Sequence, residues 1–201
     1  MSHVIDYFLV PNSPWTYLGH ERLVRMARAA GAQVRVRPMD LGKIFPLSGG
    51  LPLAKRAPQR QAYRLLELRR FSEQLGVPIT VQPRYFPVAA DAASRLIVAV
   101  DAHDGTDAAL KIAGAAMTAV WVQERDIADP EVLAGLLHEC GLPPARLEQA
   151  ADAATQQRYE ANTQAAIDAQ VFGAPSYVVD GELFWGQDRL DFVQRKLSSD
   201  H

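Results

Sequence analysis

The chain has 201 residues, of which 48% are hydrophobic and 22% are charged, and its formal net charge at pH 7 is -2. This length and hydrophobic content suffice to bury a large core, which excludes a disordered chain and allows one domain or a domain with a large insertion. With so little net charge, the composition excludes a general attraction for nucleic acid or for an anionic membrane.

The first elements in chain order are a strand, a helix and a second strand. Residues 4–10 form a short apolar run that predicts a buried strand. Ser13-Pro14 then suits the start of a helix, because Ser is a preferred N-cap and Pro suits the first helical position, and we predict that helix over residues 15–30. Residues 34–37 alternate as a strand does. This βαβ order implies parallel strands with a right-handed crossover.

A long helical region and a hairpin follow. The predicted helices cover residues 60–75, 91–102, 107–125, 130–140 and 152–170. Two short apolar runs, residues 177–179 and 183–185, flank Asp180-Gly181-Glu182 and predict a β-hairpin. Asp188 is expected to cap a last helix over residues 189–197. The complete order is therefore βαβ, a helical block, and ββα.

This order predicts an α/β protein with a thioredoxin-like fold. Residues 1–57 and 172–201 would form one discontinuous domain, and residues 58–171 would form an inserted helical domain. Thiol-disulfide oxidoreductases of this fold carry Cys-x-x-Cys where the first helix begins, because the helix N-terminus stabilises a thiolate. Here Ser13 and Thr16 occupy the two cysteine positions. We therefore expect a cofactor to supply the sulfur, with glutathione as the candidate.

Three segments could bind this cofactor, and each has a purely structural alternative. Ser13 is either a plain N-cap or a donor to the glutathione sulfur that lowers the pKa of the thiol. Ala174-Pro175 is either an ordinary strand start or, with a cis bond facing Ser13, a backbone clamp for the cysteinyl unit. Gly186-Gln187-Asp188 is either a helix start or a site for the γ-glutamyl group, whose ammonium the Asp188 carboxylate would bind.

Together, these segments resemble the family of 2-hydroxychromene-2-carboxylate isomerases and kappa-class glutathione transferases, in the DsbA-like thioredoxin superfamily. The likeness covers nearly the whole chain, and the block over residues 179–190 is its most specific part. It is carried by Ser13-Pro14-Trp15-Thr16-Tyr17-Leu18-Gly19, residues 62–78, Ala119-Val120-Trp121, Gly173-Ala174-Pro175 and residues 179–190.

The resemblance implies glutathione as the cofactor and a set of residues around it. In such an isomerase the cofactor thiolate adds to an unsaturated ring system, permits ring opening and bond rotation, and then leaves. The resemblance also implies a place in aromatic catabolism and, by analogy, a homodimer. The implied catalytic residue is Ser13, and the implied cofactor-binding residues are Ser13, Ala174, Pro175, Trp185, Gly186, Gln187 and Asp188.

Departures from the family pattern leave the substrate contacts open. Asn12 is unusual beside the sulfur position, and residues 48–52 replace a loop that supplies Asn and Lys to the ligand in relatives. A cation could bind a substrate carboxylate and an aromatic side chain could stack on a ring, although surface packing is the alternative for each. The candidates are Lys43, Lys55, Arg56, Tyr85 and Phe86. The wider basic run over residues 55–70 is predicted to be a solvated helix face.

Other chemistries are excluded. One cysteine, Cys140, cannot run a dithiol cycle, and we expect it to be a buried structural thiol at a helix end. His20 lies about two turns beyond Ser13, too far to activate it as in a serine hydrolase. We expect no metal site, because metal-ligand spacing is absent among His3, His20, His103, His138 and His201.

Three functions remain, all with a small-molecule partner. They are a glutathione-dependent isomerase, a glutathione-conjugating transferase and a non-catalytic module that binds thiol peptides. The start of the chain lacks the apolar core of about 7–15 residues that a secretory signal needs. The longest mostly apolar stretch, residues 112–122, is shorter than the roughly 20 residues that span a bilayer. We therefore expect a cytoplasmic protein.

Overall fold

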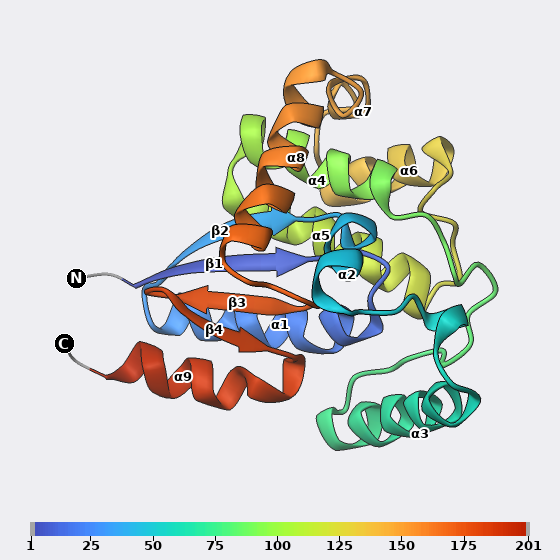
Figure 1. Ribbon diagram of the computed structural model, residues 1–201. Coiled ribbons are helices and arrows are strands. Elements are labelled where there is room, and N and C mark those ends of the chain that lie inside the picture. The colour runs from blue at the N-terminus through green and yellow to red at the C-terminus, as the bar shows by residue number, and fades with distance from the viewer. Residues whose placement is uncertain (1–2, 200–201) are drawn as a thin grey trace.

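A four-stranded mixed sheet forms the centre of the computed structural model, which describes residues 3–199 (Figure 1). Its strand order is β2-β1-β3-β4. β1 and β2 are parallel, whereas β3 is antiparallel to both β1 and β4. The strands are β1 (Val4–Leu9), β2 (Gln33–Pro38), β3 (Ser176–Val179) and β4 (Glu182–Trp185). The thioredoxin-like fold predicted from the sequence is confirmed.

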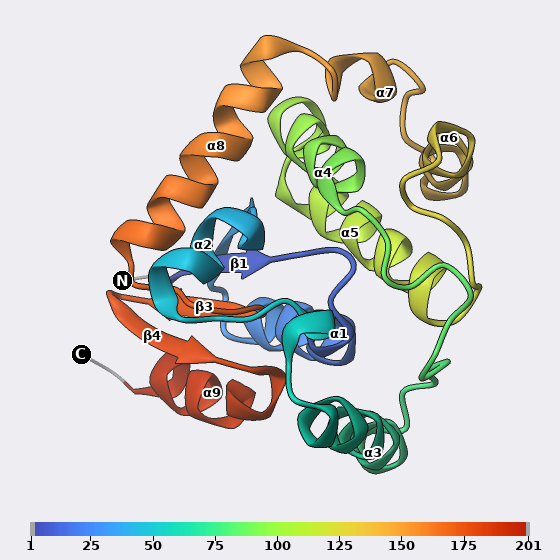
Figure 2. The ribbon, with the colours of Figure 1, turned by 45° about the vertical axis from the view of Figure 1, so that its right-hand side comes forward.

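Helices cover the sheet, and α3 to α8 are inserted between its two halves. Figure 2 shows α3 standing apart from the other inserted helices, below the start of α1. The exact domain boundaries, residues 1–57 with 172–201 and residues 58–171, stay a prediction. The helices are α1 (Pro14–Ala29), α2 (Leu41–Ser48), α3 (Pro58–Leu75), α4 (Asp91–Asp104), α5 (Thr106–Trp121), α6 (Pro130–Cys140), α7 (Arg146–Gln149), α8 (Ala153–Asp168) and α9 (Leu190–Ser198), with 3₁₀ turns η1 (Leu53–Lys55) and η2 (Gln187–Arg189).

Side chains of β1 alternate between two apolar clusters, as the two-residue repeat of a strand requires. Ile5, Tyr7 and Leu9 belong to a large cluster that also contains buried residues of α1, α4, α5, α6 and α9. Phe8 and Val10 belong to a smaller cluster with residues of α2 and α8. Because strands and inserted helices share the large cluster, most of the insertion packs on the sheet instead of forming a separate core.

The short helix α2 was missed by the sequence prediction because Gly42 and Pro46 are typical of loops. Two local features nevertheless define this helix. The Asp40 side chain caps its start and accepts a hydrogen bond from the Gly42 N–H at 2.7 Å. Gly49 ends it with φ = +73°, a left-handed conformation that glycine adopts without steric cost.

The predicted capping role of Asp188 is wrong. The chain first makes the 3₁₀ turn η2, and α9 begins at Leu190 with no side chain capping it. The Asp188 carboxylate instead pairs with the Arg189 guanidinium. The predicted helix over residues 107–125 is also too long, since α5 ends at Trp121.

Two further expectations concern Cys140 and the membrane. Cys140 is free and buried at the end of α6, as predicted. Burial raises the pKa of its thiol, so this sulfur is a poor nucleophile at neutral pH. Within residues 3–199, every helix is too short or too polar to cross a membrane.

Candidate functional site

Two adjoining cavities form a cleft beside the start of α1. The larger cavity has a volume of about 870 Å³ and lies between the start of α1, α2, η1 and the loop around residues 86–91. The smaller cavity has a volume of about 480 Å³ and lies between α3 and the turn over residues 186–189. Six residues line both cavities: Trp15, Arg56, Arg60, Arg64, Ala174 and Trp185.

Ser13 lies half-buried in the larger cavity, at the N-terminus of α1. Its Oγ accepts a hydrogen bond from the Thr16 N–H at 3.2 Å, so Ser13 is a true N-cap. The hydroxyl hydrogen remains available to a second acceptor. The Trp15 N–H has no partner within residues 3–199, and the first turn of α1 carries no acidic side chain. This helix start therefore favours an anion.

Thr16, at the second cysteine position of a dithiol motif, is placed differently. It is completely buried, and its Oγ1 has no hydrogen-bond partner in the described part of the chain. The hydroxyl therefore cannot reach a ligand in the cleft. Only Ser13 of the two substituted positions faces the cavity.

Ala174 lies across the cleft from the start of α1 and lines the same cavity as Ser13. The Ala174-Pro175 peptide bond is cis. No hydrogen bond within residues 3–199 uses the backbone N–H or carbonyl of Ala174. This unpaired backbone is what a short extended peptide needs for β-type pairing. Pro175 itself is buried.

The turn over residues 186–189 lines the smaller cavity. Gly186 has φ = +98°, and a Cβ there would lie 2.5 Å from Asp188 Oδ1, so the turn fits only glycine. The Gln187 side chain is buried, and its Oε1 accepts a hydrogen bond from Arg22 Nη1 at 3.1 Å. Gln187 can therefore offer a ligand mainly its backbone, whereas the Asp188 carboxylate is exposed in the cavity.

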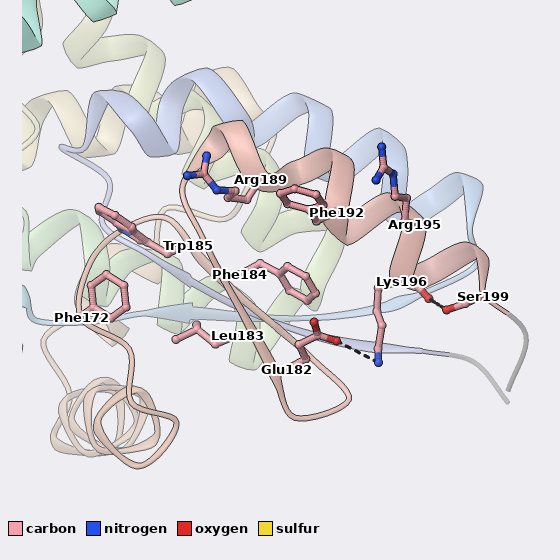
Figure 3. Close-up of a pocket in the computed structure, with 10 residues that line it drawn as sticks. All are labelled: Phe172, Glu182, Leu183, Phe184, Trp185, Arg189, Phe192, Arg195, Lys196 and Ser199. Atoms are coloured by element: carbon pink, nitrogen blue, oxygen red, sulfur yellow. Dashed lines mark hydrogen bonds and ion pairs between the residues drawn. The ribbon is translucent and has the colours of Figure 1, made fainter.

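Trp185 stands at the junction of the cleft with a third cavity. The ring packs over Gly173, where a Cβ would lie 2.5 Å from Trp185 Nε1, and lies 4.9 Å from the Phe172 ring. The third cavity, of about 680 Å³, follows β4 and α9 on the outer side of the sheet (Figure 3). Neither Ser13 nor Ala174 lines it, so it lacks the two groups that the sequence predicts beside the sulfur.

The structure brings two of the five substrate candidates to the cleft. Arg56 lines both cavities, and Phe86 lines the larger one. Lys43, Lys55 and Tyr85 are exposed and line neither of the two. The Arg84 guanidinium instead lies over the Tyr85 ring, with its central carbon 5.3 Å from the ring centroid.

Several residues of the cleft were missed by the sequence prediction. Arg64 was predicted on a solvated face but is only 9% exposed, and both it and Arg60 line the cleft. Their spacing of four residues on one helix was the available signal.

Asn12 Nδ2 donates to the Val88 carbonyl at 2.7 Å and so attaches the loop of the larger cavity to the start of α1.

Titratable groups of the cleft differ in their surroundings. Burial raises the pKa of Tyr159, which lines the larger cavity and donates to Asp91 Oδ1 at 3.5 Å. Burial and the nearby Arg56 lower the pKa of Arg64 to about 10, so it stays charged at neutral pH. Among residues 3–199, no three His, Cys, Asp or Glu side chains lie close enough to hold a metal ion. His201 lies outside the described residues.

Known proteins match this chain over nearly its full length. The model of the DSBA-like thioredoxin domain matches residues 4–198. A 2-hydroxychromene-2-carboxylate isomerase of Sphingobium xenophagum is 30% identical over 199 residues, covering 98% of this chain and 99% of the relative. Glutathione S-transferase kappa 1 of Rattus norvegicus is 24% identical over 202 residues, covering 94% and 88%.

A solved structure supports the same assignment of fold. The structure of a 2-hydroxychromene-2-carboxylate isomerase superposes with a TM-score of 0.83 and 23% sequence identity, covering 96% of this chain and 94% of the other. The sheet order, the helical insertion and the family match all indicate the same fold. The chain thus belongs to the DSBA-like thioredoxin domain family, and its relatives include 2-hydroxychromene-2-carboxylate isomerase and glutathione S-transferase kappa.

Proposed function

We propose that this protein is a glutathione-dependent isomerase of the 2-hydroxychromene-2-carboxylate type, acting on an unsaturated, aromatic-derived small molecule. One observation carries the proposal. Ser13 and the unpaired backbone of Ala174 line one cavity at a helix N-terminus, where relatives of this fold hold a reactive sulfur. The protein's own thiol, Cys140, lies elsewhere, at the end of α6.

The residues of the cleft fit glutathione. An extended peptide could pair with the Ala174 backbone, and the Asp188 carboxylate and the turn at Gly186 offer an exposed acceptor and a tight loop to the γ-glutamyl end. When bound, glutathione would supply a thiolate that adds reversibly to the substrate. The sulfur itself would lie toward Ser13.

The chain's own residues would hold and polarise these groups. The Ser13 hydroxyl, which already accepts from the Thr16 N–H, would donate to the sulfur, and the N-terminus of α1 would favour its negative charge. Apolar side chains of the larger cavity, among them Phe45, Phe86 and Val88, would hold the ring system and exclude water from it.

A single spectroscopic assay tests the proposal. Purified protein is mixed with 2-hydroxychromene-2-carboxylate, and the ultraviolet spectrum is followed with and without glutathione while free thiol is titrated in parallel. An isomerase changes the spectrum only when glutathione is present and leaves the thiol concentration constant. No spectral change at saturating glutathione would reject this activity for that substrate type.

The thiol titration and a calorimetric measurement distinguish the two alternatives. A kappa-like glutathione transferase is favoured by the second relative and would consume one thiol for each electrophile converted. A non-catalytic module would bind glutathione in calorimetry and produce no spectral change. A homodimer and a cytoplasmic location stay predictions, and analytical ultracentrifugation tests the first of them.

A further inference from the structure

Arg64 is an unpaired charge in a nearly buried position. Only 9% of the residue is exposed, although Arg is almost always solvated or paired in proteins. Within residues 3–199, its guanidinium forms no ion pair and no side-chain hydrogen bond. The residue lines both cavities of the cleft, so its free donors face space that a ligand can occupy.

Aromatic packing positions this guanidinium without satisfying it. Its central carbon lies 5.1 Å from the centroid of the Phe86 ring and 5.8 Å from that of the Trp121 ring. Such cation–π contacts stabilise the charge and fix its plane. These contacts provide no hydrogen-bond acceptor for the five N–H donors of the guanidinium.

The surrounding charges increase the need for an anion. Arg56 and Arg60 line the same two cavities, and Arg56 Nε donates to the Leu51 carbonyl, a neutral acceptor, at 2.8 Å. Three guanidinium groups thus share the boundary between the cavities.

The carboxylates of the cleft do not neutralise this group. Asp40 accepts from the Gly42 N–H, Asp91 accepts from Tyr159, and Asp188 pairs with Arg189. Glu67, one turn beyond Arg64 on α3, forms no ion pair with it within residues 3–199. The guanidinium nitrogens are not among the fully buried polar atoms, so they remain open to the cavities, where a ligand carboxylate can bind them.

We propose that Arg64 binds a ligand carboxylate at the boundary between the two cavities. The inference rests on the proposed function, because its ligands are glutathione and the organic substrate. A planar carboxylate accepts two parallel N–H bonds from a guanidinium, and Phe86 and Trp121 fix the plane in which it must lie. The carboxylate belongs either to the glycyl end of glutathione or to the substrate.

Calorimetry with paired probes shows which of these two carboxylates Arg64 binds. Glutathione is compared with its glycyl ethyl ester, and 2-naphthoate is compared with 2-naphthamide, so each pair differs in one charged group. The proteins are the wild type, Arg64→Met and the matched control Arg69→Met. Arg69 is exposed on the same helix and lines neither cavity of the cleft.

For one of the two pairs, we expect the wild type to bind the charged probe at least about tenfold more tightly than the neutral one. Arg64→Met should abolish this preference, and Arg69→Met should retain it. If Arg64→Met loses the preference within the glutathione pair, Arg64 binds the glycyl carboxylate. If it loses the preference within the naphthalene pair, Arg64 binds the substrate carboxylate. The proposal is overturned if the wild type has no preference or if Arg64→Met keeps it.

Two controls keep the result decisive. If the wild type does not bind glutathione at all, the proposed function fails, while the naphthalene pair still tests Arg64. Arg64→Lys keeps the charge but loses the planar fork, so it serves if Arg64→Met does not fold by circular dichroism. A weakened preference in Arg64→Lys supports the proposal, and an unchanged preference overturns it.

Discussion

The two sides of the cleft are built in different ways. On the sheet side, Ser13 and Ala174 lie where α1 and β3 begin, so the backbone of the fold determines their positions. On the helix side, Arg60 and Arg64 project from α3, of which only Arg64 and Leu68 are buried. The comparison shows that the sheet side supplies groups set by the fold, whereas the helix side supplies charge that depends on side chains alone.

The two sides also differ in their relation to stability. Ser13 caps α1, so its polar group already stabilises the folded protein. Arg64 has no ion pair or hydrogen-bond partner within residues 3–199, so its charge contributes little to stability beyond its contacts with Phe86 and Trp121. Substitutions on the two sides should therefore separate stability from binding.

The largest effect is expected from Ser13→Ala. Loss of a donor to the thiolate should raise the pKa of bound glutathione and reduce turnover roughly 10- to 100-fold. Loss of the N-cap should lower the free energy of unfolding by about 1 kcal/mol. Ultraviolet thiolate absorbance as a function of pH measures the first effect, and urea unfolding measures the second.

Ser13→Thr is the matched control, because it retains both the hydroxyl and the capping oxygen. Its thiol pKa should stay close to that of the wild type. An unchanged thiol pKa in Ser13→Ala would remove Ser13 from the sulfur site, whatever happened to stability.

Asp188→Ala should weaken glutathione binding about tenfold, because a charge-assisted bond to the ligand ammonium is lost. Stability should hardly change, since Asp188 does not cap α9 and its pair with Arg189 is exposed. Calorimetry measures the affinity. Asp107→Ala, which breaks an exposed Asp–Arg pair outside the cleft, is the control, and equal affinities in the two variants would contradict the role of Asp188.

Asn12→Ala tests how the sheet side holds the loop of the larger cavity. Removing the bond from Asn12 Nδ2 to the Val88 carbonyl should cost about 1 kcal/mol of unfolding free energy. Hydrogen exchange in the loop should accelerate, since one of its contacts with α1 is gone. Exchange rates identical to those of the wild type would show that other contacts fix the loop.

The smallest effect is expected on the stability of Arg64→Met. Replacing an unpaired buried charge with an apolar side chain of similar length should change the free energy of unfolding by less than about 1 kcal/mol, with either sign. Thermal unfolding without ligand measures it. A large loss of stability would mean that the contacts with Phe86 and Trp121 are structural, and the contrast between the two sides of the cleft would disappear.

Much of the fold could be predicted from local sequence signals. Ser13-Pro14 indicated where α1 begins, and Asp180-Gly181 indicated the turn of the hairpin, because each signal depends on a few neighbouring residues. Helix α2 could not be predicted in this way. Its Gly and Pro residues contradict helix propensity, and contacts with α8 and the sheet outweigh that preference.

The candidate site, like the fold, could be predicted only where local sequence signals define it. Ser13, Ala174 and Asp188 were predicted because they lie at the ends of predicted elements, and the structure places them along the cleft. Their roles toward glutathione stay predictions. The burial of Arg64 was not predicted, because it depends on Phe86 and Trp121, which are far from it in sequence and meet it only in the folded chain. Local charge patterns cannot distinguish a solvated arginine from one enclosed by distant aromatic rings.

The position of α3 has a consequence for how such proteins diversify. Sixteen of its eighteen residues are not buried, and Figure 2 shows it apart from the helices that enclose the core. Substitutions at its exposed positions should therefore leave folding intact. Those at exposed positions that line the cleft, such as Arg60 and Tyr63, should alter what this side of the cleft recognises. New ligand preferences can therefore arise on this helix while Ser13 and Ala174 stay unchanged.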